Sequence, residues 1–546
     1  LCALISKGWG IERSEMKSRI PFPLIISLVM FSLIVAALLM AGLQAADGQL
    51  GYPIDDVYIH MSIAKNFVAD GVWGITPYEF SSTTSSPLWT LLIALVYKIF
   101  GVNEWAPVAL GVLVGSVALV VCYSILKRKY TPLRLTLILI LFVFFTGMPF
   151  WAAMGMEHLL HGVLTVSLMY YAVQILFTER IRLPQYVVLF LLSAFLTLTR
   201  YEGMFLAGVL FLTFIIKKRI GAAFAVITGS FFLISIYGLI SMRNGWYFFP
   251  NTILLKGNLP EFNVEGMVQF LTKSIFNLNE TPQFFMLVLM MLMLYKRGAL
   301  QKVVNPQDRY LFGIFLATAV IHLQFSAPST FSRYETYLIL TGVVILAEKA
   351  ALIFPNMPSD AKIILKMNDI QAVTILMFAL PILQIAFLSG ILFRDYPRAI
   401  QNIHDQQYQM GLFLQEYYSG KTAAVNDIGL VSFMSESKVL DLWGLGSLDV
   451  AKEIMQGTYY STSLVQLSGR YDTKVVIIFD SWFRGVIPHE WVKVGEWEIS
   501  DNVVCGDSKV SFYVISAAAQ DELAENLREF SILLPDRVIQ RGLYMQ

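Results

Sequence analysis

The chain has 546 residues, of which 56% are hydrophobic and 14% are charged, and its formal net charge is +1. This balance excludes an ordinary soluble domain and is typical of a membrane protein with several transmembrane helices. The near-neutral charge, without a basic stripe that carries aromatic residues, excludes nucleic acid as a partner. Cys2, Cys122 and Cys505 are far apart and form no CxxC pair, so neither a disulfide framework nor a zinc site is predicted.

The first long apolar run follows Lys17 and Arg19. Met16 resembles a natural start, so residues 1–15 are expected to be a non-native or disordered extension. The run is long enough to cross a bilayer, and no small-x-small cleavage site follows it. An uncleaved first transmembrane helix is therefore favoured over a signal peptide.

Apolar segments of spanning or nearly spanning length predict about eleven transmembrane helices. They lie at 22–43, 106–126, 135–151, 158–177, 185–199, 203–216, 221–240, 284–295, 310–325, 337–354 and 369–393. Basic clusters fall at every second connection, and such clusters stay in the cytoplasm. They place the chain in a bacterial inner membrane with a cytoplasmic N-terminus and a periplasmic C-terminal tail.

The apolar segment 87–101 is short, and counting it as a span would move the basic cluster 127–129 to the outer face. A re-entrant or interfacial helix is therefore expected, and a short tilted span is the alternative. The transmembrane domain is predicted to cover residues 16–393, with an outer-face loop at 44–105. From 394 to 546, short β-rich runs alternate with helical stretches, which predicts an α/β domain of the usual size.

Two adjacent aspartates, Asp55 and Asp56, open the segment "DDVYIHMSIAKNFVADG". Its apolar spacing predicts an amphipathic helix that lies along the outer interface. One aspartate is expected to cap this helix, but capping does not require two. Asp56 and His60 are four residues apart and are expected to meet on one helix face, which leaves Asp55 slightly favoured as the chemically active carboxylate.

A hydroxyl-rich loop, "SSTTSSPLW", follows at 81–89 and includes Ser85 and Ser86. It is either a turn with an interfacial tryptophan or a set of hydrogen-bond partners for a polar headgroup. Further polar residues stand beside spans on the same predicted face, where ionisable groups commonly line a cavity. These residues are Glu157, His158, Arg200, Glu202, Asn251, Lys256, Arg333 and Glu335.

The alternative for two of these sets is a structural ion pair, Arg200 with Glu202 or Arg333 with Glu335. Several cations and one carboxylate, however, suit transfer of a sugar from a polyprenyl phosphate. The leaving phosphate holds negative charge, so cationic donors can replace a general acid. A carboxylate then only takes the proton of the attacking hydroxyl.

The arrangement resembles the GT-C superfamily of polyprenyl-phosphate-dependent glycosyltransferases. The motifs "DDVYIHMSIAKNF", "SSPLWTLLIAL", "GMEHLL", "LTRYEG", "PNTILLK", "SRYET" and "NDIGLVSFMSESKVLDLWGL" follow the order of the group that contains the mycobacterial terminal arabinofuranosyltransferases. The resemblance runs from about residue 50 to 450. It implies a fold of GT-C type and transfer of one sugar, with inversion, to an envelope glycan or glycolipid.

The resemblance also implies roles for residues. Asp55 or Asp56 would be the catalytic base, and Arg200, Lys256 or Arg333 would contact the donor phosphate. The other donor-side candidates are His60, Glu157, Glu202 and Asn251. No cofactor is predicted, and no metal, although some GT-C enzymes place a divalent metal beside the first-loop aspartate.

In the tail, Asp427 and Asp441 follow predicted strands beside glycines, and Trp443 is close by. The aspartates are either turn residues or, with Trp443, Ser85 and Ser86, contacts to the acceptor glycan. A transporter or flippase of lipid-linked sugars would use the same cavity without a base. A membrane-anchored glycan-binding protein would use the tail alone.

Overall fold

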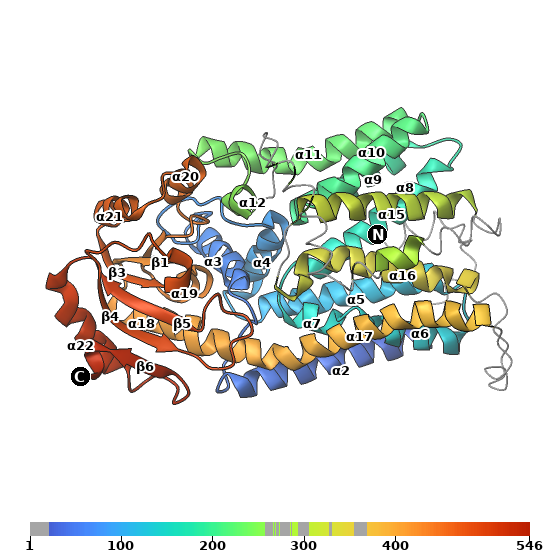
Figure 1. The fold of residues 1–546 in the computed structure, drawn as a ribbon. Helices are drawn as coiled ribbons and strands as arrows, with labels where there is room; N and C mark the ends of the chain where they lie inside the picture. The colour runs from blue at the N-terminus through green and yellow to red at the C-terminus, as the bar shows by residue number, and fades with distance from the viewer. Residues whose placement is uncertain are drawn as a thin grey trace.

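The computed structural model describes residues 21–256, 287–292, 305–326, 330–353 and 369–546, together with positions 266, 268, 272 and 284. Two parts are visible, a bundle of long helices and a mixed α/β domain at one end of it (Figure 1). The bundle end that carries this domain is called the domain end below.

The bundle consists of apolar helices that overlap the predicted spans. Four of them, α2, α5, α8 and α11, are long and apolar enough to cross a membrane by length and composition. The helices with their bounds are α2 (Phe22–Ala45), α5 (Ala106–Leu126), α6 (Pro132–Phe145), α8 (His158–Leu176), α9 (Leu183–Thr199), α10 (Gly203–Ile216), α11 (Ile220–Arg243), α15 (Pro306–Phe325), α16 (Thr336–Ile353) and α17 (Asp369–Ile403). Of the predicted span 284–295, residues 284 and 287–292 are described and are helical, whereas the other positions lie outside the described residues, as does the extension 1–15.

Two spans end differently from the prediction. The span expected at 135–151 stops at Phe145, because Gly147 takes a left-handed conformation with φ 62° and starts the short helix α7 (Met148–Ala153). Helix α17, expected to end near 393, continues into the α/β domain (Figure 1). The charged residues Arg394 and Arg398 do not stop it, because their side chains are exposed on its surface. Residue 394, the predicted start of the outer domain, thus lies inside a continuous helix.

Helices α3 (Asp56–Ala69) and α4 (Pro87–Phe100) lie at the domain end of the bundle (Figure 1). The sequence predicted that α3 lies on an open interface, but residues 57–64 are all buried. The helix is enclosed because α4 packs on one side and α19 (Gly429–Met434) on the other. Helix α4 has 14 residues, or about 21 Å at about 1.5 Å per residue, which is less than the apolar thickness of a bilayer.

The α/β domain is built on a sheet with strand order β2-β1-β3-β5-β4-β6. Its strands are β1 (Thr422–Val425), β2 (Lys438–Asp441), β3 (Thr473–Ile478), β4 (Val492–Glu498), β5 (Lys509–Val514) and β6 (Ile539–Gly542). Strands β1, β2 and β3 are parallel, and β5, β4 and β6 continue the sheet in antiparallel order.

Both faces of the sheet are covered, as the alternation along β3 requires. Val475 and Ile477 pack against α18 (Gln409–Tyr417) and α22 (Gln520–Phe530). Val476 and Ile478 pack on the opposite face against α21 (Ser461–Arg470) and Val450 of α20 (Leu448–Gln456). The predicted α/β architecture of the tail is therefore confirmed.

Candidate active site

The two adjacent aspartates at the start of α3 have different partners. Both carboxylate oxygens of Asp55 accept backbone hydrogen bonds from α19, one from Gly429 N at 2.7 Å and one from Leu430 N at 2.8 Å. A Cβ at position 429 would lie 2.1 Å from the Asp55 carbonyl oxygen, so only glycine allows this approach. Burial and the nearby Asp427 raise the pKa of Asp55 to about 8, against the effect of the two N–H donors. Asp55 thus joins the α/β domain to the bundle.

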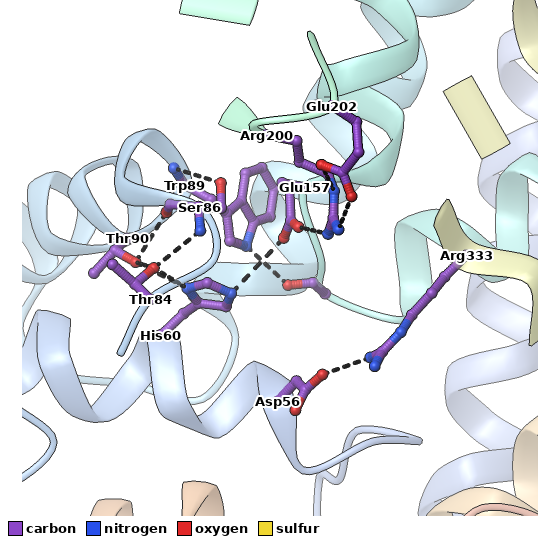
Figure 2. Close-up of polar contacts among 11 residues, drawn as sticks. Asp56, His60, Thr84, Ser86, Trp89, Thr90, Glu157, Arg200, Glu202 and Arg333 are labelled. Atoms are coloured by element: carbon purple, nitrogen blue, oxygen red, sulfur yellow. Dashed lines mark hydrogen bonds and ion pairs between the residues drawn. The ribbon is translucent and has the colours of Figure 1, made fainter. Parts of the chain in front are cut away.

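Asp56 instead accepts a hydrogen bond of 2.6 Å from Arg333 Nη1 (Figure 2). Its side chain is 31% exposed, compared with 12% for Arg333. Burial raises the pKa of Asp56, but the charges of Arg333 and Lys256 lower it by more. The net pKa of Asp56 is well below its ordinary value. Asp56 is therefore an ionised carboxylate that remains within reach of a ligand.

The segment that carries Arg333, η2 (Thr330–Glu335), has an unusual backbone. Phe331 and Ser332 both have positive φ angles, 63° and 54°. This bend directs Arg333 to Asp56, so the ion pair with Glu335 that the sequence offered as an alternative is not formed. Glu335 lies 3.6 Å from His322 Nε2 instead.

His60 is buried and does not contact Asp56, contrary to the prediction from their spacing. Its Nδ1 lies 3.0 Å from Thr84 Oγ1 and 2.8 Å from Thr90 Oγ1, and its Nε2 lies 3.8 Å from Glu157 Oε2 (Figure 2). Burial lowers the pKa of His60, although Glu157 acts in the opposite direction. His60 is thus positioned by the hydroxyl-rich loop.

Arg200 is held between two carboxylates, as Figure 2 shows. Nη1 donates to Glu157 Oε1 at 2.7 Å, and Nη2 and Nε donate to Glu202 at 2.7 Å and 3.2 Å. The predicted pair of Arg200 with Glu202 is therefore present. Its guanidinium also lies 4.6 Å from the ring centre of Tyr334, which is a cation–π contact.

Three candidates hold parts of the site in place through buried contacts. Ser86 caps α4, where its side chain accepts a hydrogen bond from Trp89 N at 3.4 Å. Asn251 is buried at the start of α12 (Asn251–Lys256) and donates to Gly444 O of the α/β domain at 2.8 Å. Glu157 is fully buried. These side chains fix the loops that carry other candidates.

A cavity of about 310 Å³ opens beside Asp56, and we call it the bundle cavity. Much of its wall is apolar, formed by Met156, Met204, Phe205, Phe249, Ile253, Leu254 and Phe325. Most polar candidates line it too, namely Asp56, His60, Ser85, Arg200, Glu202, Lys256 and Arg333. Among the residues that the structure describes, Arg333 Nε, Thr83 Oγ1 and Thr252 Oγ1 are buried in this wall without a hydrogen-bond partner.

A second cavity, of about 330 Å³, lies between the bundle and the α/β domain, and we call it the interdomain cavity. It is lined by Asp55, Gln407, Asn426, Asp427, Trp443, Trp482 and Cys505, among others. Asp56, Lys256 and Arg333 line both cavities. The two cavities therefore meet at one carboxylate and two cations.

Of the tail candidates, Asp427 and Trp443 reach the interdomain cavity, but Asp441 does not. Asp441 is fully buried and accepts backbone hydrogen bonds from Trp443 N at 2.8 Å and Gly446 N at 2.6 Å, so it stabilises a turn. Asp427 accepts a 2.7 Å bond from Gln407, and burial raises its pKa to about 6. The ring of Trp443 lies 4.7 Å from that of Trp482.

Several lining residues were not predicted from the sequence. Trp482 and Asn426 follow strands β3 and β1, and the carboxyl ends of parallel strands are the usual place for a ligand in an open α/β sheet. That rule offered the signal that could have found them. Thr252 and Tyr334 stand next to predicted residues and have no sequence signal of their own.

No metal was predicted, and the resemblance left metal ligation open; the two aspartates of the first loop have the following partners. Both oxygens of Asp55 already accept N–H donors, and Asp56 is paired with a guanidinium. In the described part of the chain, no three His, Cys, Asp or Glu side chains form a group that could hold a metal ion.

Comparison with known proteins identifies the fold. A family model described as a domain of unknown function, DUF8728, matches residues 401–513, and no curated protein matches the chain. Two crystal structures of ArnT from Cupriavidus metallidurans are similar, one in the apo state and one bound to undecaprenyl phosphate. The TM-scores are 0.51 and 0.50, at 13% identity over 89% of this chain and 98% of ArnT.

At this identity the likeness concerns the fold. It shows a fold like that of ArnT, and membership of the GT-C superfamily stays a prediction from the sequence. The closer relation to the arabinofuranosyltransferase group stays a prediction, as do the number of spans and the orientation of the termini. The chain is a multi-pass membrane protein with an ArnT-like fold.

Proposed function

We propose that the protein is an inverting glycosyltransferase of the bacterial inner membrane. It transfers one monosaccharide from a polyprenyl phosphate to a hydroxyl of an envelope glycan or glycolipid on the periplasmic side. The observation that carries this proposal is the meeting of two unlike cavities at Asp56, Lys256 and Arg333.

The bundle cavity suits the donor. Its apolar wall fits isoprenoid units, while Lys256 and Arg333 can neutralise a phosphate at its polar end. The unpartnered Arg333 Nε supplies a donor to a phosphate oxygen, and the unpartnered Thr83 and Thr252 hydroxyls can bond the sugar. Arg200 is occupied by Glu157 and Glu202, so it shapes the cavity rather than holding the phosphate. The likeness to ArnT, solved with undecaprenyl phosphate, supports such a donor.

The interdomain cavity suits the acceptor. Two tryptophans, Trp443 and Trp482, with the polar groups of Asn426, Gln407 and Asp427, form the kind of surface that sugar rings contact. An acceptor hydroxyl from the interdomain cavity would therefore reach Asp56 from one side, while the donor sugar would lie on the other side, in the bundle cavity.

Asp56 is the proposed base. Although Asp55 was slightly favoured from sequence, its two oxygens are used by α19, whereas Asp56 faces both cavities. Asp56 takes the proton of the acceptor hydroxyl, whose oxygen bonds to the anomeric carbon. The bond from that carbon to the phosphate oxygen breaks, and Arg333 and Lys256 stabilise the released phosphate.

Mass spectrometry of lipids that co-purify with the full chain tests the donor. The wild type should carry a polyprenyl-phosphate sugar, and Arg333→Met should lose most of it, because the phosphate loses a charged donor. Arg243→Met, at an exposed arginine at the end of α11, is the matched control and should retain the lipid. Only bulk phospholipid in the wild type would contradict the proposed donor.

A further inference from the structure

The loop between α22 and β6, residues 531–538, exposes apolar side chains. Ile532 is 87% exposed and Leu533 is 67% exposed, the highest values among the large apolar residues of the α/β domain. They are flanked by Phe530 and Leu534, which are 1% and 6% exposed and belong to the domain core. The loop is therefore anchored at both sides while its tip stays uncovered.

Sheet topology places this loop on the edge that faces the bundle. The carboxyl ends of the parallel strands β1 and β3 form that edge, because the residues after them line the interdomain cavity. Since β5 is antiparallel to β3, β4 to β5 and β6 to β4, strand β6 starts at the same edge. Ile539, the first residue of β6, is 48% exposed and extends the apolar patch.

An ion-pair contact confirms this position independently. Arg537 Nη2 donates to Asp47 Oδ2 at 2.8 Å, and Arg537 Nε donates to Asp405 Oδ2 at 2.6 Å. Asp47 follows directly after α2, a span of 24 residues. That helix is about 36 Å long at about 1.5 Å per residue, slightly more than the apolar core of a bilayer. Asp47, and with it Arg537, therefore lies at the level of the lipid headgroups.

We infer that Ile532, Leu533 and Ile539 form a membrane anchor that inserts into the lipid interface beside α2. The lipid surface is favoured over a protein partner because Arg537 ties the loop to the end of α2, a helix long enough to span a bilayer, and Met40 near that end is itself 58% exposed. Arg537 pairs with both Asp47 and Asp405, so neither carboxylate is left without a cationic partner near the headgroups. The anchor ties β6, the outermost strand of the sheet, to the membrane, whereas Asp55 ties α19 to the bundle.

Spin labelling in nanodiscs tests this anchor on the full chain. In a background with Cys2→Ser, Cys122→Ala and Cys505→Ser, a nitroxide is placed at Ile532→Cys or Leu533→Cys. Molecular oxygen, which concentrates in lipid, should relax the label more strongly than a water-soluble nickel chelate. The control is Ala517→Cys, an exposed residue after β5 and hence on the opposite edge of the sheet, where the chelate should dominate.

The outcomes separate lipid contact from other states. Equal accessibility of the chelate at 532, 533 and 517 would overturn the anchor and leave the patch as a docking site for a protein. Because the readout is accessibility and not sugar transfer, its failure does not touch the proposed reaction. Melting curves of the cysteine-free background, compared with the wild type, verify that the labelled chains are folded.

Discussion

The bundle cavity and the interdomain cavity are similar in volume but differ in their walls. One is lined mainly by aliphatic and aromatic side chains from the membrane helices, with charges gathered at one end. The other joins two tryptophans, amides and carboxylates, many of them from the α/β domain. This difference fits the proposed binding of a lipid on one side and a glycan on the other. Among the residues that the structure describes, the two cavities share Asp56, Ile59, Lys256 and Arg333.

The largest effect is expected at Asp56, which lines both cavities. Asp56→Asn should lower the turnover number of sugar transfer by about 10²–10⁴-fold, the usual contribution of a general base. The KM for the acceptor should change little, and the polyprenyl-phosphate sugar should still co-purify. Transfer kinetics with reconstituted protein measure this, and Asp70→Asn, an exposed aspartate after α3, is the control. Full activity of Asp56→Asn would remove Asp56 from the chemistry.

Asp55 is expected to matter for the junction between the bundle and the α/β domain. Asp55→Ala leaves the N–H groups of Gly429 and Leu430 without their acceptor, which should cost about 1–3 kcal/mol of stability. A lower melting temperature in detergent, with loss of transfer in proportion to the unfolded fraction, is the expected result. Asp70→Ala serves as the exposed control. An unchanged melting temperature together with abolished transfer would instead make Asp55 the base.

A smaller effect is expected on the acceptor side alone. Trp443→Ala should raise the KM for the glycan acceptor by about two- to tenfold, since an aromatic contact contributes about 0.5–1.5 kcal/mol. The amount of co-purified donor lipid should not change, because Trp443 does not line the bundle cavity. Tyr460→Ala, at an exposed aromatic residue near α21, is the matched control. A parallel loss of donor lipid would show that the cavities are not separate.

The last prediction concerns the pH dependence of stability and does not involve sugar transfer. Burial raises the pKa of Asp55 to about 8 and that of Asp427 to about 6, from about 3.9 in an unfolded chain. Between about pH 4 and about pH 8 the folded protein therefore binds more protons than the unfolded chain, so its stability should fall as pH rises through this range. Melting temperatures across this range measure the slope. Asp427→Asn should flatten it near pH 6, and an unchanged slope would contradict the role of Asp427.

Much of the fold could be predicted from the sequence because the signals are local. Apolar runs and strand patterns depend on neighbouring residues, and they located α2, α5, α8 and the sheet. The bends could not be found in this way. The break at Gly147 depends on a single backbone angle, and the length of α17 depends on whether its polar continuation meets a domain.

The structure brings most of the predicted site residues together around two cavities, but several of the predicted pairings are not formed. Asp56 meets Arg333, 277 positions away, and Asp55 meets Gly429, 374 positions away. Spacing rules connect only near neighbours, so they paired Asp56 with His60 and offered Arg333 with Glu335 as an alternative. Asp441 looked like Asp427 in sequence, since both follow strands, and only burial separates them.

Helix α17 has 35 residues, which at about 1.5 Å each gives a rod of about 52 Å. A bilayer core takes up about 30 Å of such a rod, so about 20 Å projects beyond it. The length of this projecting part sets the distance between the lipid and the sheet. A longer or shorter α17 would move Trp443 and Trp482 away from Asp56, and in the proposed reaction the acceptor glycan would then lie too far from the lipid-linked sugar.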